Sequence, residues 1–328
     1  MFPRAPGQLV PIANRPLLHH AVAALRDAGV REVAVLAGPA VGPAVRAALP
    51  SGAAWKVQLQ HIEVPAGSAD LAALRQASRF IGDAPVIVHR GEALLADELP
   101  AELKAFLGGG ADAAVLDRPG AGPADELAQR RARRRSIAQL SLGVDLLSPR
   151  AVAGLDELAD GDGKHLVLEE ALARLATVGL EVQRREIAGG WALGDDVDDL
   201  LEGNRLALDR AESSWDPSVL RHSRIEGRVI VDPSARIEDS LVRGPSVIGP
   251  GVVLRHAYVG PYTSVAAGVL IENAEIEHSM ILEDVSIAHV PWRLERSVIG
   301  ARTRISHEFR VPQTVALLVG EDARITVS

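Results

Sequence analysis

The sequence predicts an α/β domain followed by a left-handed parallel β-helix, on the basis of two patterns that meet near residue 213. In the first part, helical apolar patterns alternate with short apolar runs, as in a parallel sheet covered by helices. In the second part, aliphatic residues recur near every sixth position, between small or turn residues. We therefore expect two domains, residues 1–212 and 213–328.

The first domain is expected to contain four helices and five strands. Helical apolar patterns, with turn or capping residues at their ends, cover residues 16–29, 69–80, 167–177 and 197–211. Short apolar runs bounded by turn residues predict strands at 33–36, 85–89, 113–116, 141–147 and 181–187. The last helix, 197–211, is expected to close the domain.

The second domain is predicted from an internal repeat. Hexapeptides on one template begin at Val231, Ile237, Ile248, Val259, Val265 and Ile271. Each is expected to form one short strand and one turn with its aliphatic residue inward, so that three of them close a triangular coil. A β-sandwich with regular turns is the alternative. The six-residue period favours the β-helix, whose flat apolar side faces and open ends would favour self-association.

Composition excludes several classes of protein. The chain has 328 residues, a net charge of -8 and no cysteine, which argues against a nucleic-acid binder and excludes disulfides and thiolate chemistry. The first twenty residues contain four prolines and no continuous apolar core, and no later apolar run reaches the roughly 18 residues that span a bilayer. We expect no membrane partner and a cytoplasmic location.

Several motifs resemble the long, β-helix-bearing glucose-1-phosphate thymidylyltransferases, a branch of the sugar-1-phosphate nucleotidylyltransferase family. The most specific is Gln-Leu-Val-Pro-Ile-Ala-Asn-Arg-Pro-Leu-Leu at residues 8–18. Residues 65–69, 143–149 and 259–264 are also similar, as are Trp191 and the pair Asn204-Arg205. The resemblance covers nearly the whole chain and implies a Rossmann-like nucleotidyltransferase sheet before the β-helix.

The resemblance also implies a reaction, in which a sugar phosphate attacks the α-phosphorus of a nucleoside triphosphate. The family uses a glycine-rich loop around the triphosphate, a lysine before the Gln-Leu motif and two aspartates that hold magnesium. Here Met1 stands where the first strand and glycine-rich loop should already have passed, so both are expected to be missing. The alternative is a start codon placed too far downstream, which the DNA before Met1 would reveal.

The charged positions implied by the resemblance are largely replaced. The lysine position falls on Gly7, with Arg4 as a distant substitute, and the first metal aspartate corresponds to Glu92, a candidate magnesium ligand. The second metal aspartate falls on Leu193. A one-residue slip would use Asp195 or Asp196, although acids there are more simply explained as the cap and first turn of a helix.

Other substrate-binding positions are implied by the resemblance as remnants. They are Gln8, Gly67, Ser68, Gly91, Arg131, Gly143 and His165. Gly67 and Ser68 are expected in a weak nucleobase site, and His165 replaces the sugar-binding glutamate. Arg131 matches the sugar-phosphate lysine, but it lies in an arginine run that is more typical of a solvated face or a docking surface.

The sequence therefore predicts a catalytically degenerate homologue without a cofactor. We expect it to bind a nucleotide or sugar phosphate weakly, or to act as a regulatory or scaffolding subunit in a homo-oligomer or beside an active homologue. The first alternative is an active magnesium-dependent nucleotidylyltransferase that uses Glu92. The second is a hexapeptide acyltransferase, whose histidine base would be one of His256, His278, His289 and His307.

Overall fold

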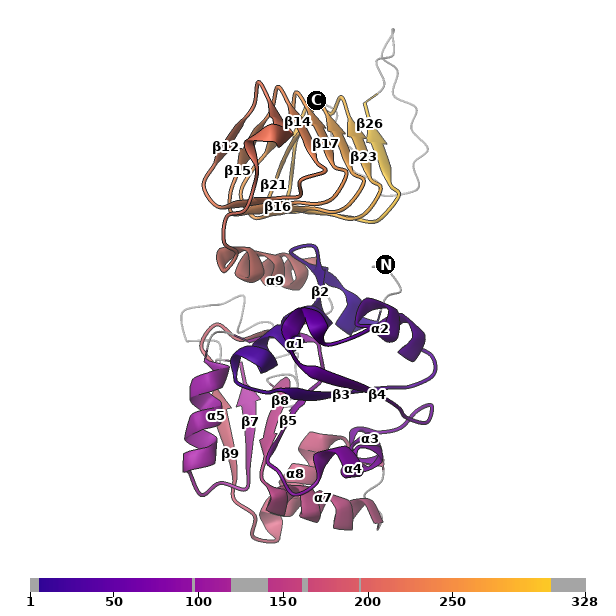
Figure 1. The fold of residues 1–328 in the computed structure, drawn as a ribbon, viewed down its shortest axis with the longest axis vertical. Helices are drawn as coiled ribbons and strands as arrows, with labels where there is room; N and C mark the ends of the chain where they lie inside the picture. Colours follow the sequence, from indigo (N-terminus) through magenta and orange to yellow (C-terminus); the bar gives the residue numbers. More distant parts are fainter. Residues whose placement is uncertain (1–5, 96–97, 119–140, 161–164, 195, 308–328) are drawn as a thin grey trace, which may run out of the picture.

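The protein has two parts stacked along its long axis, an α/β part and a parallel β-helix (Figure 1). The computed structural model describes residues 6–95, 98–118, 141–160, 165–194 and 196–307. Helix α9 (Val197–Asp209) lies between the two parts. The described residues include no helix that is long and apolar enough to cross a membrane.

The centre of the α/β part is a four-stranded sheet with the order β5-β8-β7-β9. Its strands are β5 (Val86–His89), β7 (Ala113–Asp117), β8 (Ser141–Leu147) and β9 (Val182–Glu186). The sheet is mixed, because β8 runs antiparallel to β5 and β7 while β7 and β9 are parallel. The expectation of a purely parallel sheet was wrong, since a continuous apolar run marks a buried strand but does not report its direction.

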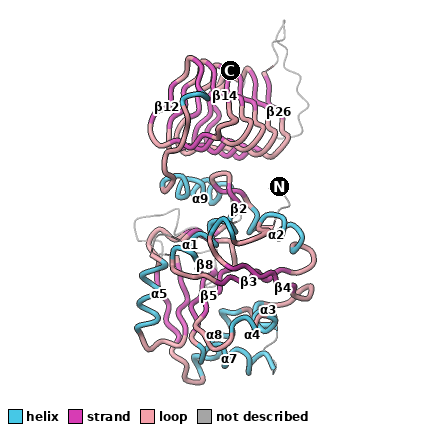
Figure 2. The backbone as a smooth tube through the Cα atoms, in the orientation of Figure 1, coloured by secondary structure: helices cyan, strands magenta, loops and turns pink. Residues whose placement is uncertain are grey.

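Helices cover both faces of this sheet (Figure 2). Side chains of α1 (Leu17–Asp27) and α5 (Leu99–Gly108) join the core on one face. Side chains of α3 (Asp70–Gln76), α7 (Pro149–Asp160) and α8 (Leu168–Thr177) join the core on the other. The helix expected at 69–80 is interrupted at Ala77, whose N–H donates to the carbonyl of Leu74 three residues back, and continues as α4 (Ser78–Ile81).

Shorter elements complete the α/β part. They are the 3-10 turns η1 (Gly7–Leu9) and η2 (Ala53–Trp55), the hairpin β1 (Pro11–Ile12) and β2 (Arg15–Pro16), the parallel pair β3 (Glu32–Ala37) and β4 (Gln58–Glu63), helix α2 (Gly42–Ala48), and the antiparallel pair β6 (Ala93–Leu94) and β10 (Trp191–Ala192). The η1 turn, β6 and β10 carry the candidate site.

The β-helix consists of three parallel sheets after the turn η5 (Pro217–Val219). The first contains β11 (Leu220–Arg221), β14 (Arg236–Glu238), β17 (Val253–Arg255), β20 (Leu270–Glu272), β23 (Ser286–Ala288) and β26 (Arg304–Ser306). The second contains β12 (Arg224–Glu226), β15 (Leu241–Arg243), β18 (Tyr258–Val259), β21 (Glu275–Glu277) and β24 (Arg293–Glu295). The third contains β13 (Val229–Val231), β16 (Ser246–Ile248), β19 (Thr263–Val265), β22 (Met280–Ile281) and β25 (Val298–Ile299).

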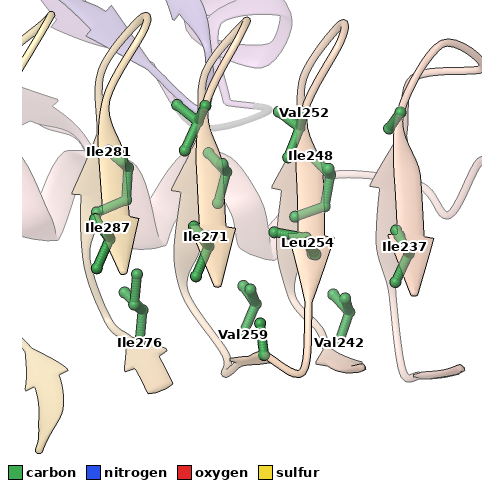
Figure 3. Close-up of a cluster of buried hydrophobic side chains, with 14 of the residues drawn as sticks. Ile237, Val242, Ile248, Val252, Leu254, Val259, Ile271, Ile276, Ile281 and Ile287 are labelled. Atoms are coloured by element: carbon green, nitrogen blue, oxygen red, sulfur yellow. The ribbon is translucent and has the colours of Figure 1, made fainter. Parts of the chain in front are cut away.

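Aliphatic side chains fill the interior of the β-helix in columns, and each coil contributes one side chain to a column (Figure 3). Ile237, Leu254 and Ile271 are successive partners in one column and are almost fully buried. Equivalent corner residues such as Ser223 and Ser240 are 17 residues apart, so a coil is shorter than three full hexapeptides. The strict six-residue period was therefore an overstatement, because the corner after the first sheet needs only two residues, as at His222 and Ser223.

The third sheet of the β-helix packs against the α/β part. Met280 and Val298 from this sheet join a cluster with Ile12 of β1 and Trp191 of β10. Because β1 directly follows the η1 turn, the β-helix is anchored close to the segment that carries Gly7 and Gln8.

Candidate functional site

The turn after β5 forms one wall of the candidate site. The imidazole of His89 accepts a hydrogen bond at Nδ1 from the Gly91 N–H at 2.8 Å, and Gly91 has φ +78°, which favours glycine. Burial lowers the pKa of His89 to about 4, so the ring is neutral and holds this turn as a hydrogen-bond acceptor. Glu92 follows this turn and lies directly before β6, which pairs with β10.

The η1 turn places Gly7 and Gln8 against this wall. Gln8 Nε2 donates to Glu92 Oε1 at 2.8 Å, and a Cβ built on Gly91 would lie 3.1 Å from Gln8 Cγ. A Cβ built on Gly7 would fall inside van der Waals contact of Glu92 Oε1. The longer glutamate therefore occupies the space that a side chain at position 7 would need.

Leu193 completes the same contact. Its N–H donates to the carbonyl of Glu92 at 2.8 Å, and its Cδ2 would lie 3.1 Å from a Cβ at Gly7. The structure thus brings together the three positions at which the resemblance implies a lysine and two aspartates. In this chain they carry glycine, glutamate and leucine.

This arrangement does not fit a magnesium ion. Burial raises the pKa of Glu92, with Arg90 acting in the opposite direction, and one carboxylate oxygen already accepts from Gln8. Magnesium requires a near-octahedral set of oxygen ligands, and Leu193 supplies an aliphatic side chain instead. Within the described residues, no group of three or more His, Asp or Glu side chains has the arrangement of a metal site.

Gly143, one of the remnant substrate-binding positions, is covered by the side chain of Arg90. A Cβ built on Gly143 would lie 3.1 to 3.3 Å from the aliphatic carbons of Arg90. The guanidinium extends to Asp70 at the start of α3, with Nη2 and Oδ2 3.3 Å apart. Asp145, two residues further along β8, is 2% exposed, and burial raises its pKa to about 7 while Arg90 lowers it.

The remaining predicted site residues are spread apart or lie outside the described residues. Gly67 and Ser68 form an exposed turn before α3, in which Ser68 Oγ donates to the Pro65 carbonyl at 2.8 Å. His165 is exposed just before α8. Arg131, Arg4 and Asp195 lie in segments that are not described.

Asp196 occupies the position expected of a helix cap. Its Oδ1 accepts a hydrogen bond from the Asp199 N–H at 2.7 Å at the start of α9. The capping interpretation is thus confirmed for Asp196, because the carboxylate satisfies one of the free N–H groups of the first turn.

The histidines of the β-helix lie at corners and not in an enclosed site. His256, His278 and His289 have φ between 45° and 56°, a left-handed conformation that a polar residue tolerates at such corners. His256, His289 and His307 are exposed. The structure assigns none of them a hydrogen-bond partner typical of a catalytic base, and His289 Nδ1 lies 3.2 Å from Asn273 Nδ2.

Comparisons with known proteins agree with this fold. Residues 4–117 match the family described as nucleotidyl transferase. A glucose-1-phosphate thymidylyltransferase of Streptomyces griseus is 30% identical over 98% of this chain and 93% of its own length. The low-salt glycan biosynthesis nucleotidyltransferase Agl11 of Haloferax volcanii is 28% identical over 98% of this chain and 94% of its own length.

A crystal structure supports the fold alone. It is a Bacillus anthracis protein provisionally assigned as a glucose-1-phosphate thymidylyltransferase, in complex with sucrose, with 18% identity and a TM-score of 0.54 over 65% of this chain and 92% of that chain. Fold and sequence together define a sugar-1-phosphate nucleotidyltransferase-like protein. The chain belongs to the nucleotidyltransferase family that includes the glucose-1-phosphate thymidylyltransferases.

Sequence reasoning missed Arg90, Asp70 and Asp145. Asp145 was the detectable one, because a single acid inside the apolar run of β8 is unusual for a strand that packs on both faces. The ion pair of Arg90 with Asp70 joins residues far apart in the sequence and had no local signal.

Proposed function

We propose that this chain is a nucleotidyltransferase homologue without catalytic turnover that acts as a binding, regulatory or scaffolding subunit. The contact of Gly7, Glu92 and Leu193 carries the proposal. In the resembled family the same three positions supply one cation and two magnesium ligands, whereas here they pack against one another with a single side-chain hydrogen bond from Gln8.

The expected loss of rate is large. One electrostatic group in a transition state is typically worth roughly 2.7 to 4 kcal/mol, so losing two of them removes on the order of 10⁴-fold of rate even with some non-additivity. The alternative of an active magnesium-dependent enzyme would need Glu92 to release Gln8 and bind the ion without an acid at Leu193. The acyltransferase alternative is not supported by the corner positions of the histidines.

The test is a coupled pyrophosphate assay with glucose-1-phosphate, magnesium and each common nucleoside triphosphate. We expect turnover far below about 1 s⁻¹, the low end of ordinary enzymes. The matched comparison is a triple variant, Gly7→Lys with Glu92→Asp and Leu193→Asp. Any rate that it gains over wild type would assign the lost activity to these three positions. Wild-type turnover above that level which disappears in Glu92→Ala overturns the proposal.

Association with other subunits is part of the proposal. Outward residues of the second sheet are charged and paired, as in Arg243 with Glu226 at 2.8 Å and Arg293 with Glu275 at 2.8 Å, so this face is not apolar. The first strands of the first and second sheets, β11 and β12, each pair with one other strand of their sheet, and such edges favour pairing with another chain. Light scattering at micromolar concentration should show more than one subunit, alone or with a co-expressed active homologue. A monomer in both cases contradicts this part.

Weak nucleotide binding at Gly67 and Ser68 is the remaining part. The exposed turn leaves backbone accessible to a base, but no phosphate-binding cation lies at Gly7. Saturation by a nucleotide below about 1 μM, roughly 8 kcal/mol of binding free energy, would contradict this view.

A further inference from the structure

A cluster of charged side chains lies on the α3 and α8 side of the central sheet. Its members, named here the Arg90 cluster, are Asp70, Arg90, Asp117, Asp145, Glu169 and Arg184. Within it, Arg184 is occupied by Asp117, with two nitrogen–oxygen distances of 2.7 Å, and by Glu169 at 2.9 Å. Arg90 is the guanidinium that pairs with Asp70, and its electrostatic effect on the pKa of Asp145 is larger than that of Arg184.

Asp145 is the buried member of the Arg90 cluster. It lies in β8 opposite Val88 of β5 and Val115 of β7, and Val115 in turn pairs with Arg184 of β9. Its side chain is almost completely inaccessible, with 2% of its surface exposed. A buried carboxylate needs hydrogen-bond donors or a nearby cation to keep its charged form.

Arg90 supplies that cation from inside the chain. Its backbone N–H donates to the Gly143 carbonyl at 2.9 Å, its aliphatic carbons lie over Gly143, and its guanidinium reaches Asp70. The side chain thus spans the distance from β8 to the start of α3. Asp70 Oδ2 also accepts from the Leu168 N–H at 3.1 Å, so this contact joins the starts of α3 and α8.

We propose that the Arg90 side chain is a built-in occupant of the remnant substrate-binding position at Gly143. Its aliphatic carbons cover Gly143 and its guanidinium pairs with Asp70, so that a sugar phosphate is excluded. The proposal rests on the proposed function only in taking Gly143 as a remnant substrate-binding position. Acids outnumber guanidinium groups in the Arg90 cluster by four to two, so the site repels a phosphate dianion and attracts a cation. The electrostatic effect of Arg90 on the pKa of Asp145, which opposes the effect of burial, agrees with this role.

The experiment removes the internal cation and offers one from solution. Arg90→Ala is titrated with methylguanidinium chloride while its unfolding temperature is measured, with sodium chloride at equal ionic strength as the blank. We expect a saturable rise in unfolding temperature with a dissociation constant on the order of 1 mM. Wild type, whose site is filled, should show no such rise. If Arg90→Ala does not fold alone, the folded yield with and without methylguanidinium becomes the readout.

Matched variants make the result specific. Arg75 forms a surface ion pair with Asp160, and Arg75→Ala should show no saturable rescue. In Arg90→Ala with Asp145→Asn, methylguanidinium affinity should fall at least tenfold. Equal rescue of Arg75→Ala, or no rescue of Arg90→Ala, overturns the proposal.

A second titration separates this proposal from the proposed function. Inorganic phosphate and glucose-1-phosphate should stabilise neither wild type nor Arg90→Ala, because the acids of the Arg90 cluster remain. Phosphate binding to Arg90→Ala with an affinity equal to that of methylguanidinium overturns the cation site. Turnover in the pyrophosphate assay would overturn the proposed function. It would not affect the cation site, because rescue by methylguanidinium does not depend on turnover.

Discussion

The segment from η1 to the β1-β2 hairpin contributes residues to two regions of the molecule, the candidate site and the junction with the β-helix, which differ in how their polar groups are paired. At its start, Gly7 and Gln8 enter the candidate site, where one side-chain hydrogen bond to Glu92 accompanies packing against Leu193. A few residues later, Ala13 and Asn14 enter the junction with the β-helix, where polar groups are densely paired.

The junction is centred on Asn204 of α9, which is fully buried. Asn204 Oδ1 accepts from the Ala13 N–H at 3.0 Å and from Ser264 Oγ, and its Nδ2 donates to the Tyr262 carbonyl at 3.1 Å. Asn14 Nδ2 adds a bond to the Val265 carbonyl at 2.7 Å. We therefore expect the stability of this chain to depend more on the contacts that hold its two parts together than on the contacts at the candidate site.

The largest effect is expected from breaking the junction. Asn204→Ala leaves the Ala13 N–H, the Ser264 hydroxyl and the Tyr262 carbonyl without their partner in a buried interface. We expect a loss of about 3 kcal/mol in the free energy of unfolding, because each buried unpaired group costs about 1 kcal/mol or more. Urea unfolding measures it.

Asn14→Gly is the matched control for this prediction. Glycine accepts the φ of +61° at this position, so the substitution removes the bond to Val265 without backbone strain and should cost about 1 kcal/mol. If Asn204→Ala costs no more than Asn14→Gly, the junction is not the centre of stability.

The second largest effect is a pH dependence that comes from Asp145. Burial raises its folded-state pKa to about 7, above the ordinary value of 3.8, so the folded protein holds a proton that the unfolded chain releases. Its destabilising effect is complete above pH 7 and is relieved as the pH falls from 7 toward 4. We expect Asp145→Asn to be more stable than wild type by on the order of 2 kcal/mol at pH 8, with the difference vanishing near pH 4.

The quantity to measure is the difference in stability between wild type and Asp145→Asn, because the titration of His89 changes the stability of both proteins in the opposite direction. Its folded-state pKa of about 4 lies below the ordinary 6.5, so His89 destabilises the fold as the pH falls from 6.5 toward 4 in both proteins. This contribution cancels in the comparison of thermal unfolding curves. A constant difference between pH 4 and pH 8 would show that Asp145 is ionised throughout.

The sequence predicted the β-helix and the helices α1, α3, α8 and α9 because their patterns are local, whereas α2, α5 and α7 were not predicted. Aliphatic residues such as Ile237 and Leu254 repeat along the chain, and each repeat reports its own burial. Strand direction in the central sheet was not predicted, since an apolar run such as β8 looks the same whether its neighbours are parallel or antiparallel.

The resemblance implied which positions would lie together at the candidate site, but not their contacts. The resemblance located Gly7, Glu92 and Leu193, and the structure brings them together. Neither the bond from Gln8 to Glu92 nor the path of Arg90 over Gly143 had a signal in the sequence, because both join residues that are distant along the chain.

A smaller effect tests whether the candidate site tolerates a side chain at position 7. Gly7→Ala forces the Glu92 carboxylate to rotate away and lose its bond to Gln8, which we expect to cost between about 1 and 2 kcal/mol. The shorter acid in Gly7→Ala with Glu92→Asp should recover most of this. A thermal-unfolding double-mutant cycle measures the coupling, and additive effects would show that the two side chains do not compete for the same space.

The smallest effect concerns Asp196, which lies along the chain between Leu193 at the site and Asn204 at the junction. Its carboxylate caps α9 through the Asp199 N–H, so Asp196→Ala should lower the free energy of unfolding by about 1 kcal/mol, while Asp196→Asn, which keeps the acceptor, should change it by only a few tenths. A magnesium ligand would behave differently, because millimolar magnesium would then stabilise wild type and both variants would lose that gain. Urea unfolding with magnesium or with EDTA separates the two roles. A cap stabilises the fold equally in both solutions, whereas a magnesium-dependent difference confined to wild type would assign Asp196 to the candidate site as a magnesium ligand.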